Sequence, residues 1–314
     1  MIGGLRMYRR WKRGAFYALA LAVCLAGLAC RSVPFTSKSA KKAETLALNR
    51  EGIAAFERSE YELAQERFAQ AVKNDEADLT SQRYYAETLW MQGKKEEAVR
   101  RLVEISKADA STEEALAVNR SIAEKLLSAG QPISALNYAE KTVSLAPERF
   151  EGWALRGNVY WQLGKTEEAL ADYHKALHFA PDDRNLLWQM AILEDQAGRS
   201  DRSLATWQRL GRLYPGNTEP VEVLCGKGLA YRRLKRYDES VRHYEAALAQ
   251  SPDLAEIYPL LADVYLDRDD WASAAQVARR AEALFPANPQ MREFSARIEQ
   301  LRLAAQSAPK ENLR

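Results

Sequence analysis

The sequence predicts an all-α protein, a solenoid of about seven stacked helix pairs. Three observations predict it. A small residue recurs about every 34 positions, and Ala or Ser follows it twelve positions later. A proline often comes a further twelve positions on, and no strand-like alternating run interrupts the pattern. A fixed period of this length is typical of stacked helical repeats, which present an extended concave surface to a partner.

The clearest copy of the pattern is Phe150–Asp183. Its marker residues are Trp153, Gly157, Tyr160, Gly164, Ala169, Tyr173, Ala176 and Pro181. The spacing indicates two helices with Gly164 in the turn between them. Gly157 and Ala169 are small because the two helices approach closely there. Pro181 ends the second helix, since a proline nitrogen has no hydrogen to donate to the helical ladder.

This copy resembles the tetratricopeptide repeat (TPR), whose pattern is aromatic, small, aromatic, then Ala, aromatic, Ala and Pro. The resemblance implies a right-handed superhelical solenoid of about seven TPR helix pairs with a C-terminal capping helix. The predicted repeats are Thr45–Asp78, Leu79–Thr112, Leu116–Arg149, Phe150–Asp183, Arg184–Asn217, Val221–Leu254 and Ala255–Asn288. Three-residue insertions, Glu113–Ala115 and Thr218–Pro220, separate repeats without breaking the count.

The segment after the last repeat predicts an amphipathic helix. Residues 289–306 carry apolar side chains at helical spacing, namely Met291, Phe294, Ile298 and Leu301. A solenoid needs a helix there to cover its last exposed face. Residues 307–314 are predicted to be a disordered tail.

The N-terminus predicts export. Five basic residues precede an apolar run from Gly14 to Ala29. The run is shorter than the roughly 20 apolar residues of a membrane span. Residues 1–30 are therefore predicted to be a signal peptide or a membrane anchor.

Leu28-Ala29-Cys30 resembles the lipobox of bacterial lipoproteins, which implies acylation of Cys30. Gly27 departs from the motif, which prefers an aliphatic residue there, and Cys24 fits the motif less well. An uncleaved signal anchor and soluble secretion are the alternatives. The first two readings tether the chain to a membrane, facing the periplasm or the cell exterior.

Residues 31–44 are predicted to be a flexible tether between membrane and array.

Charge and cysteine content limit the kinds of partner and of covalent link that we expect. The leader holds five of the 45 basic residues and no acid, so 40 basic residues face 43 acidic ones in the rest of the chain. A net charge near −3 gives no general basic surface for nucleic acid. Cys225 is the one cysteine beyond the leader, so no disulfide forms within the array.

The partner-binding prediction comes from positions that repeat packing does not need. In a TPR superhelix the second, fifth, ninth, twelfth and thirteenth residues of each repeat face the concave groove. Trp and Arg there are the residue types most often found as binding hot spots. The predicted partner-binding residues are Phe56, Arg83, Trp90, Arg120, Asn158, Trp161 and Trp188. Together they predict a groove, centred on repeats two to five, that binds an extended or helical peptide. The alternative is that the tryptophans pack locally against neighbouring helices.

Catalysis is not predicted. His174 and His178 lie four apart, a spacing that suits metal ligands, but the sequence supplies no third ligand and no HExxH motif. There is no Gly-rich phosphate loop and no GxSxG, so no cofactor and no metal are predicted. Asn49 and Ile53 stand where a chaperone-binding TPR clamp needs Lys and Asn, so that ligand is not supported.

The sequence therefore predicts a non-catalytic scaffold in a cell-envelope assembly that binds a protein or peptide. Similar architecture, an anchor followed by several TPRs, occurs in lipoproteins of pilus, secretion-pore and outer-membrane assembly. The alternative is an accessory subunit of an envelope enzyme, such as a peptidoglycan-modifying one. Metal-dependent hydrolysis through the two histidines is a distant third.

Overall fold

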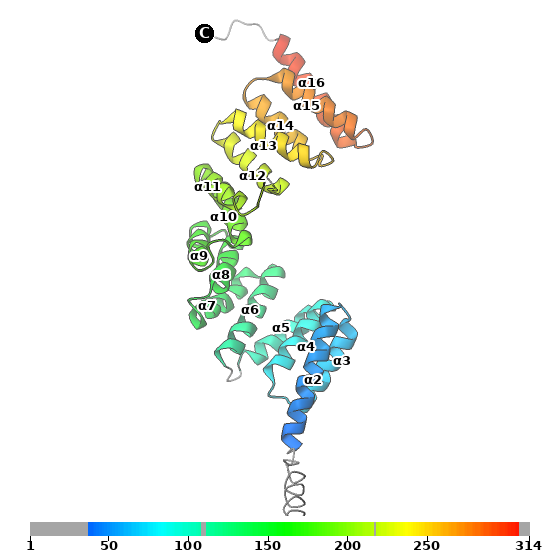
Figure 1. Ribbon diagram of the computed structural model, residues 1–314, viewed down its shortest axis with the longest axis vertical. Helices are drawn as coiled ribbons and strands as arrows, with labels where there is room; N and C mark the ends of the chain where they lie inside the picture. The colour runs from blue at the N-terminus through cyan, green and yellow to red at the C-terminus, as the bar shows by residue number, and fades with distance from the viewer. Residues whose placement is uncertain (1–36, 108–110, 217, 308–314) are drawn as a thin grey trace, which may run out of the picture. The chain divides into compact units, whose positions relative to one another are not determined.

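A computed structural model describes residues 37–107, 111–216 and 218–307. These residues form fifteen α-helices and no strand, labelled α2 to α16 in Figure 1. The predicted all-α fold of stacked helix pairs is confirmed. No helix within the described ranges is long and apolar enough to cross a membrane. The leader with Cys24 and Cys30 lies outside the described residues, as do residues 31–36 of the predicted tether.

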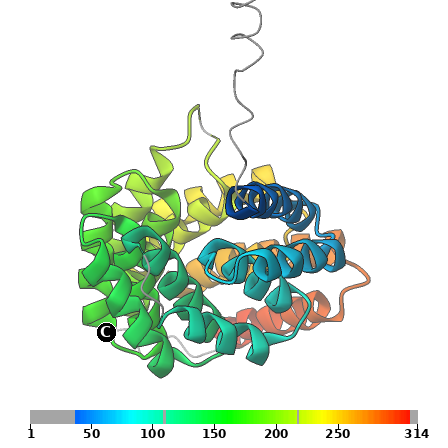
Figure 2. The ribbon, with the colours of Figure 1, turned by 90° about the horizontal axis from the view of Figure 1, so that it is seen from below.

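The helices divide into two compact units, Met1–Glu114 and Ala115–Arg314. The N-terminal unit is built from α2 (Ser37–Glu57), α3 (Tyr61–Asn74), α4 (Leu79–Met91) and α5 (Lys95–Ile105). Each of these helices packs against the next, and Figure 2 shows α2 beside the helices that follow it. Ala55, Ala64 and Phe68 form a core cluster with no exposed surface.

The C-terminal unit continues the pairs. They are α6 (Thr112–Ser128) and α7 (Pro132–Leu145), α8 (Phe150–Gln162) and α9 (Thr166–Phe179), α10 (Arg184–Gln196) and α11 (Ser200–Gly211), α12 (Val221–Arg233) and α13 (Tyr237–Gln250), and α14 (Ile257–Asp267) and α15 (Trp271–Leu284), with α16 (Pro289–Ser307) last. From α7 to α16 each helix packs against its neighbour in sequence. The apolar core therefore runs along the unit between successive helices.

The small residues of the pattern lie where the helices of a pair meet. A Cβ atom added at Gly157 would lie 2.8 Å from the ring of Tyr173 on α9, so only glycine admits the ring. Ser203 and Ser240 stand where other repeats have alanine. Each hydroxyl donates a hydrogen bond to the carbonyl of the small residue opposite, Ala191 at 3.0 Å and Gly228 at 2.7 Å. A buried serine is tolerated there because its hydroxyl is satisfied.

The turn between the helices of a pair uses the same backbone conformation in every repeat. The fifteenth residue of each repeat has a positive φ. Four are glycines, namely Gly93, Gly130, Gly164 and Gly198, and three are Ser59, Lys235 and Asp269. Left-handed backbone favours glycine, which explains why the glycine signal marks the turn in most repeats.

Three segments differ from the sequence-based expectation. Helix α2 includes residues 37–44 of the predicted tether, consistent with the helix-favouring Ala, Lys and Glu there. Glu113–Ala115, predicted as an insertion, lies in α6. Ser111 and Glu114 bond each other's side chain and backbone as a capping box that starts this helix early.

The third difference is at the cap. Helix α16 packs against α15 with Met291, Phe294 and Ile298 buried, but Leu301 is 41% exposed. Leu303 is exposed as well, so the first part of α16 covers the last repeat and its C-terminal part does not.

Candidate functional site: a furrow between the first helices of two repeats

The first helices of repeats three and four, α6 and α8, enclose an open furrow of about 450 Å³. We call it the α6–α8 furrow. Its lining residues are Arg120, Glu124, Leu127 and Ser128 of α6, and Phe150, Glu151, Ala154, Leu155, Asn158 and Gln162 of α8. Two of the predicted partner-binding residues, Arg120 and Asn158, thus lie in one cavity.

Helix α8 is fixed by contacts outside the furrow. Arg156 donates two hydrogen bonds to Asp172 of α9, at 2.7 and 2.8 Å, with little exposure of the carboxylate. The indole of Trp153 donates to the carbonyl of Pro147 at 2.8 Å. At Gly152, an added Cβ would approach the backbone of Thr142 at 3.2 Å. Helix α8 is therefore held against α7 and α9, while its small Ala154 leaves room on the α6 side.

Asn158 has a fixed orientation. The buried hydroxyl of Tyr173 donates to Asn158 Oδ1 at 2.6 Å. Because the carboxamide oxygen is occupied in this way, the amide nitrogen is the donor that remains for a group in the furrow. This arrangement suits recognition of a carbonyl or carboxylate oxygen.

The furrow carries charges of both signs. Arg120 Nε lies 3.8 Å from Glu124 Oε1, and Arg149 donates to Glu151 at 3.3 Å. Burial opposes ionisation of Glu151. Its backbone hydrogen bond and its bond to Arg149, with the charges of Arg149 and Arg120, outweigh that effect and hold its pKa below the ordinary value. Glu151 is therefore an anion at neutral pH, and the furrow has no single-sign field.

Trp161 and Trp188 are half-buried and pack against the core cluster of the C-terminal unit. The indole of Trp161 donates to Gln196 Oε1 on α10 at 3.0 Å. The ring of Trp188 meets that of Trp207 edge to face, with centroids 5.1 Å apart. Neither lines the furrow. Their structural contacts are those of the local-packing alternative, and their contact with a partner stays a prediction.

The other three predicted residues belong to the N-terminal unit. The ring of Phe56 lies edge-on to those of Tyr61 and Tyr84. The guanidinium of Arg83 lies 4.4 Å from the centroid of the Tyr84 ring. Trp90 is half-buried, with the Lys95 ammonium 5.3 Å from its ring centroid. Phe56 and Arg83 thus share one aromatic neighbour, and their role in binding also stays a prediction.

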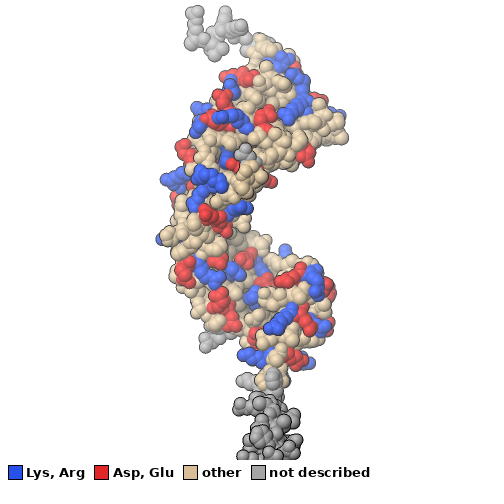
Figure 3. Space-filling model, viewed as in Figure 1, with Lys and Arg blue, Asp and Glu red and all other residues tan. Residues whose placement is uncertain are grey.

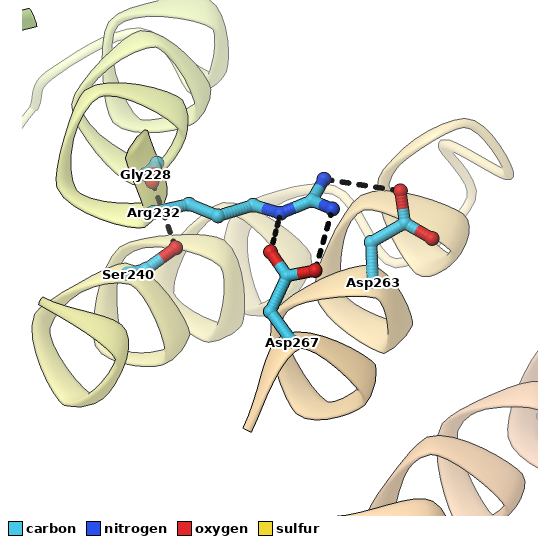
Figure 4. A network of polar contacts seen from close by, with 5 residues as sticks. All are labelled: Gly228, Arg232, Ser240, Asp263 and Asp267. Atoms are coloured by element: carbon cyan, nitrogen blue, oxygen red, sulfur yellow. Dashed lines mark hydrogen bonds and ion pairs between the residues drawn. The ribbon is translucent and has the colours of Figure 1, made fainter. Parts of the chain in front are cut away.

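Beyond α8, ion pairs connect the first helices of successive repeats. Arg233 of α12 lies 2.6 Å from Asp195 of α10. Arg232 donates to Asp267 at 2.6 Å and to Asp263 at 3.0 Å, both on α14 (Figure 4). These side chains occupy the ninth, twelfth and thirteenth positions of their repeats. The positions that line the furrow at α6 and α8 are therefore used for internal contacts farther along.

Some residues of the α6–α8 furrow were predicted from the sequence, and others were not. Glu124, Ser128, Glu151 and Gln162 were not singled out, although they occupy the second, ninth and thirteenth positions. The same count would have found them. Phe150 and Leu155 lie outside that count, and no sequence signal identified them.

The two histidines of α9 and the cysteine of α12 are not arranged as a metal site or a reactive thiol in the described residues. Both histidines of α9, His174 and His178, are exposed. Over the described ranges, no group of three His, Cys, Asp or Glu side chains is arranged to hold a metal ion. Burial, and secondarily the charge of Glu222, raises the pKa of the Cys225 thiol to about 11, which keeps it protonated at neutral pH.

Stacked helix pairs that recur about every 34 residues define a helical-repeat solenoid. Models of the tetratricopeptide repeat match residues 49–111, 150–183 and 220–287, together more than half of the chain. The chain therefore belongs to the tetratricopeptide-repeat proteins.

Curated relatives match only in part. A CTR9 homolog of Arabidopsis thaliana is 26% identical over 159 residues, which are 51% of this chain and 14% of that protein. A TPR repeat-containing protein of Rhizobium etli is 24% identical over 108 residues, which are 33% of this chain and 53% of that protein. The chain thus spans about half, or much less, of the length of these relatives.

Solved structures share the fold. PilF of Pseudomonas aeruginosa has a TM-score of 0.60 at 15% identity, covering 71% of this chain and 99% of that one. A TPR protein of Parabacteroides merdae has a TM-score of 0.56 at 19% identity, covering 82% and 99%. YrrB, described as a TPR protein with an unusual peptide-binding site, has a TM-score of 0.51 at 18% identity, covering 62% and 100%. At these identities the likeness concerns the fold alone.

Proposed function

We propose that this protein is a non-catalytic scaffold, exported and tethered to a membrane by its N-terminal segment, that binds a peptide or protein partner in the α6–α8 furrow. The observation that carries the binding part is the furrow itself. It joins an oriented amide donor at Asn158, a cation at Arg120 and the apolar side chains of Leu127 and Leu155. Polar groups at defined positions beside apolar side chains in one cleft are typical of ligand sites.

The relatives support the same reading. The repeats that the family models match serve protein association by stacking into extended binding surfaces. Among proteins of similar fold, YrrB is described as having a peptide-binding site. Export and tethering are supported by the basic and apolar leader and by the lipobox-like Leu28-Ala29-Cys30. A role in an envelope assembly follows if the partner is also exported.

The binding proposal is tested with peptides selected by the full-length protein from a displayed random dodecamer library. Asn158→Asp is the sharpest variant, because it keeps the oxygen that accepts from Tyr173 and replaces the amide donor with an acceptor. We expect at least about tenfold weaker binding of the selected peptides, the loss of one well-placed hydrogen bond. Ala154→Trp, which fills the furrow, is expected to abolish binding.

The matched control is Ala171→Trp, at an exposed alanine of α9 outside the furrow. It should leave binding unchanged, and circular dichroism should show equal helicity in all variants. Peptides that bind equally well to the Asn158 and Ala154 variants would overturn the proposal. Truncating Trp161 and Trp188 together is a less clean test, because both pack on the core and their loss costs stability.

The partner itself identifies the assembly. A photo-crosslinking amino acid at Ala154, compared with one at Ala171, reports proteins that enter the furrow in intact cells. Components of a pore or pilus would support the scaffold proposal. An envelope hydrolase or synthase would instead favour the accessory-subunit reading.

A further inference from the structure

The junction between repeats five and six contains a buried ion pair that the repeat pattern does not require. The three additional residues 218–220 bring Glu219 next to α12, where its carboxylate accepts a hydrogen bond from Lys227 Nζ at 2.6 Å. Lys227 is only 6% exposed. Gly211 makes this possible, since an added Cβ there would lie 2.5 Å from the Lys227 ammonium nitrogen.

Comparison with repeat four explains the insertion. Lys227 occupies the seventh position of its repeat, where repeat four has Arg156. The partner of Arg156 is Asp172, at the twenty-third position. In repeat six that position is His243. Because a buried cation needs a counter-charge, the inserted Glu219 supplies the carboxylate that α13 lacks.

Beside this ion pair, Glu219, α12 and α13 line a second cavity of about 610 Å³, which we call the α13 cavity. Its lining residues are Glu219, Leu224, Tyr231, Glu239, Arg242, His243, Ala246, Ala249 and Gln250. The rings of Tyr231 and His243 stack with an angle of 8° and centroids 5.2 Å apart. Burial lowers the pKa of His243, and the charge of Lys227 adds to the effect, so the imidazole is neutral at neutral pH. With the small Ala246 and Ala249, the stacked pair forms a largely apolar wall.

The charged side chains that line the cavity differ in whether they have an ion-pair partner. Glu219 is bonded to Lys227, and Glu239 accepts from Arg236 Nε at 2.9 Å. Arg242 is exposed and is in none of the ion pairs among the described residues, although its charge contributes, after that of Arg236, to lowering the pKa of Glu239. Lys227 and Arg236 already pair with the two carboxylates, so Arg242 is the cation of the lining that remains open to a ligand. A ligand that carries a carboxylate complements it.

We propose that the α13 cavity is a second docking site, which takes an acidic segment of a protein partner. A carboxylate of the segment binds Arg242, and a neighbouring apolar side chain packs on Leu224, Ala246 and the Tyr231–His243 pair. This site goes beyond the proposed function, because it is lined by both helices of one pair and shares no residue with the α6–α8 furrow. A scaffold with two such sites holds two segments at once.

The test uses dodecamers displayed on phage, selected on the full-length protein and counter-selected on an Ala246→Trp variant with a filled cavity. We expect the surviving peptides to be enriched in Asp and Glu. Their affinity, measured by fluorescence anisotropy, should fall at least about tenfold with Arg242→Gln. Arg202→Gln, at an exposed arginine of α11, and Ala171→Trp are the matched controls and should change nothing.

The outcomes separate this proposal from the first one. If the selected peptides lose binding with Ala154→Trp and keep it with Ala246→Trp, they bind the α6–α8 furrow. That result would overturn the proposed α13 site and leave the furrow proposal standing. A selection with no cavity-dependent peptide, or with no enrichment of acidic residues, would also overturn it. Competition by free glutarate as strong as that by the peptides would show a small-molecule site and contradict a protein partner. Circular dichroism of each variant excludes unfolding as the cause.

Discussion

Two tyrosines at the same repeat position differ in one hydrogen bond. Tyr173 and Tyr244 are both fully buried. The hydroxyl of Tyr173 donates to Asn158, whereas that of Tyr244 has no partner. The reason lies in the first helix of each repeat, where Leu229 occupies the position of Asn158. A buried hydroxyl without a partner costs free energy, so repeat six carries a penalty that repeat four does not.

This difference predicts opposite effects of the same substitution. Tyr173→Phe is expected to lower the free energy of unfolding by about 1 kcal/mol, because a hydrogen bond is lost. Tyr244→Phe is expected to leave it unchanged or to raise it by a similar amount. Urea unfolding followed by circular dichroism measures both. Tyr173→Phe should also weaken binding of furrow-selected peptides, since Asn158 is no longer oriented, and Tyr244→Phe should not. Equal effects of the two variants would contradict this account.

A buried carboxylate on α10 predicts a pH dependence. Glu194 is 2% exposed, and Thr206 donates to it at 2.7 Å. Burial raises its pKa in spite of that hydrogen bond and of the charges of Arg202 and Arg199. A raised folded-state pKa means that stability is greatest below the unfolded pKa of about 4.3 and falls as the pH rises through the folded value.

Glu194→Gln keeps an oxygen for Thr206 and removes the charge. We therefore expect the variant to unfold at a higher temperature than the parent at pH 7, with the difference vanishing near pH 4. Glu239→Gln is the control, for which the expected change in stability at pH 7 has the opposite sign. Its bond to Arg236, the largest cause, lowers its pKa, so its carboxylate stabilises the fold above the unfolded pKa and the variant should lose stability at pH 7. Equal melting temperatures for the parent and the Glu194 variant at pH 7 would refute the prediction.

At the level of helices, the turn between the two helices of a pair is well predicted by glycine, but three of the seven turns have no glycine. Gly164 predicted the turn of repeat four, and its positive φ confirms it, with Gly93, Gly130 and Gly198 in the same conformation. Ser59, Lys235 and Asp269 adopt the same conformation without a glycine signal. An L-residue in left-handed backbone costs about 1 kcal/mol, a strain that stacking of the flanking helices offsets.

Lys235→Gly is therefore expected to stabilise the protein by about 0.5–1 kcal/mol. Lys235 is exposed and makes no side-chain bond among the described residues, so the change removes strain and little else. The reverse change, Gly164→Lys, should destabilise the protein by about 1 kcal/mol or more. Chemical denaturation of the two variants against the parent measures both effects. A destabilising Lys235→Gly would mean that the side chain, not the backbone, decides this turn.

The repeat period also shows what sequence reasoning recovers of the site. Counting positions predicted that Arg120 and Asn158 share one face, because every repeat presents the same positions there. The count did not show that Trp161 and Trp188 pack on the core or that α6 begins early at its capping box. It also did not show that Arg232 is bound to Asp263 and Asp267. Those outcomes depend on which side chains meet in space, within a repeat at Trp188 and Trp207 or between repeats at Arg232, and the spacing of the small residues carries no information on them.

At the scale of the molecule, Lys and Arg side chains are interspersed with Asp and Glu side chains over the face seen in Figure 3. The furrow uses first helices only, and the α13 cavity uses both helices of one pair. Two sites on separate repeats suit a protein that brings two segments together, and tethering to a membrane would raise their local concentration there.

Tethering is the last prediction, and it rests on Cys30. If Cys30 is acylated, the mature chain begins at this residue and its intact mass exceeds the polypeptide mass by a diacylglycerol or a triacyl group. Cys30→Ala is then expected to move the protein from the membrane to the soluble fraction while its helicity is unchanged. Cys24→Ala is the matched control and should have no effect. A chain that retains Met1 and stays in the membrane in both variants would instead be held by an uncleaved signal anchor. A chain cleaved without added mass would be a secreted protein, which contradicts the tether altogether.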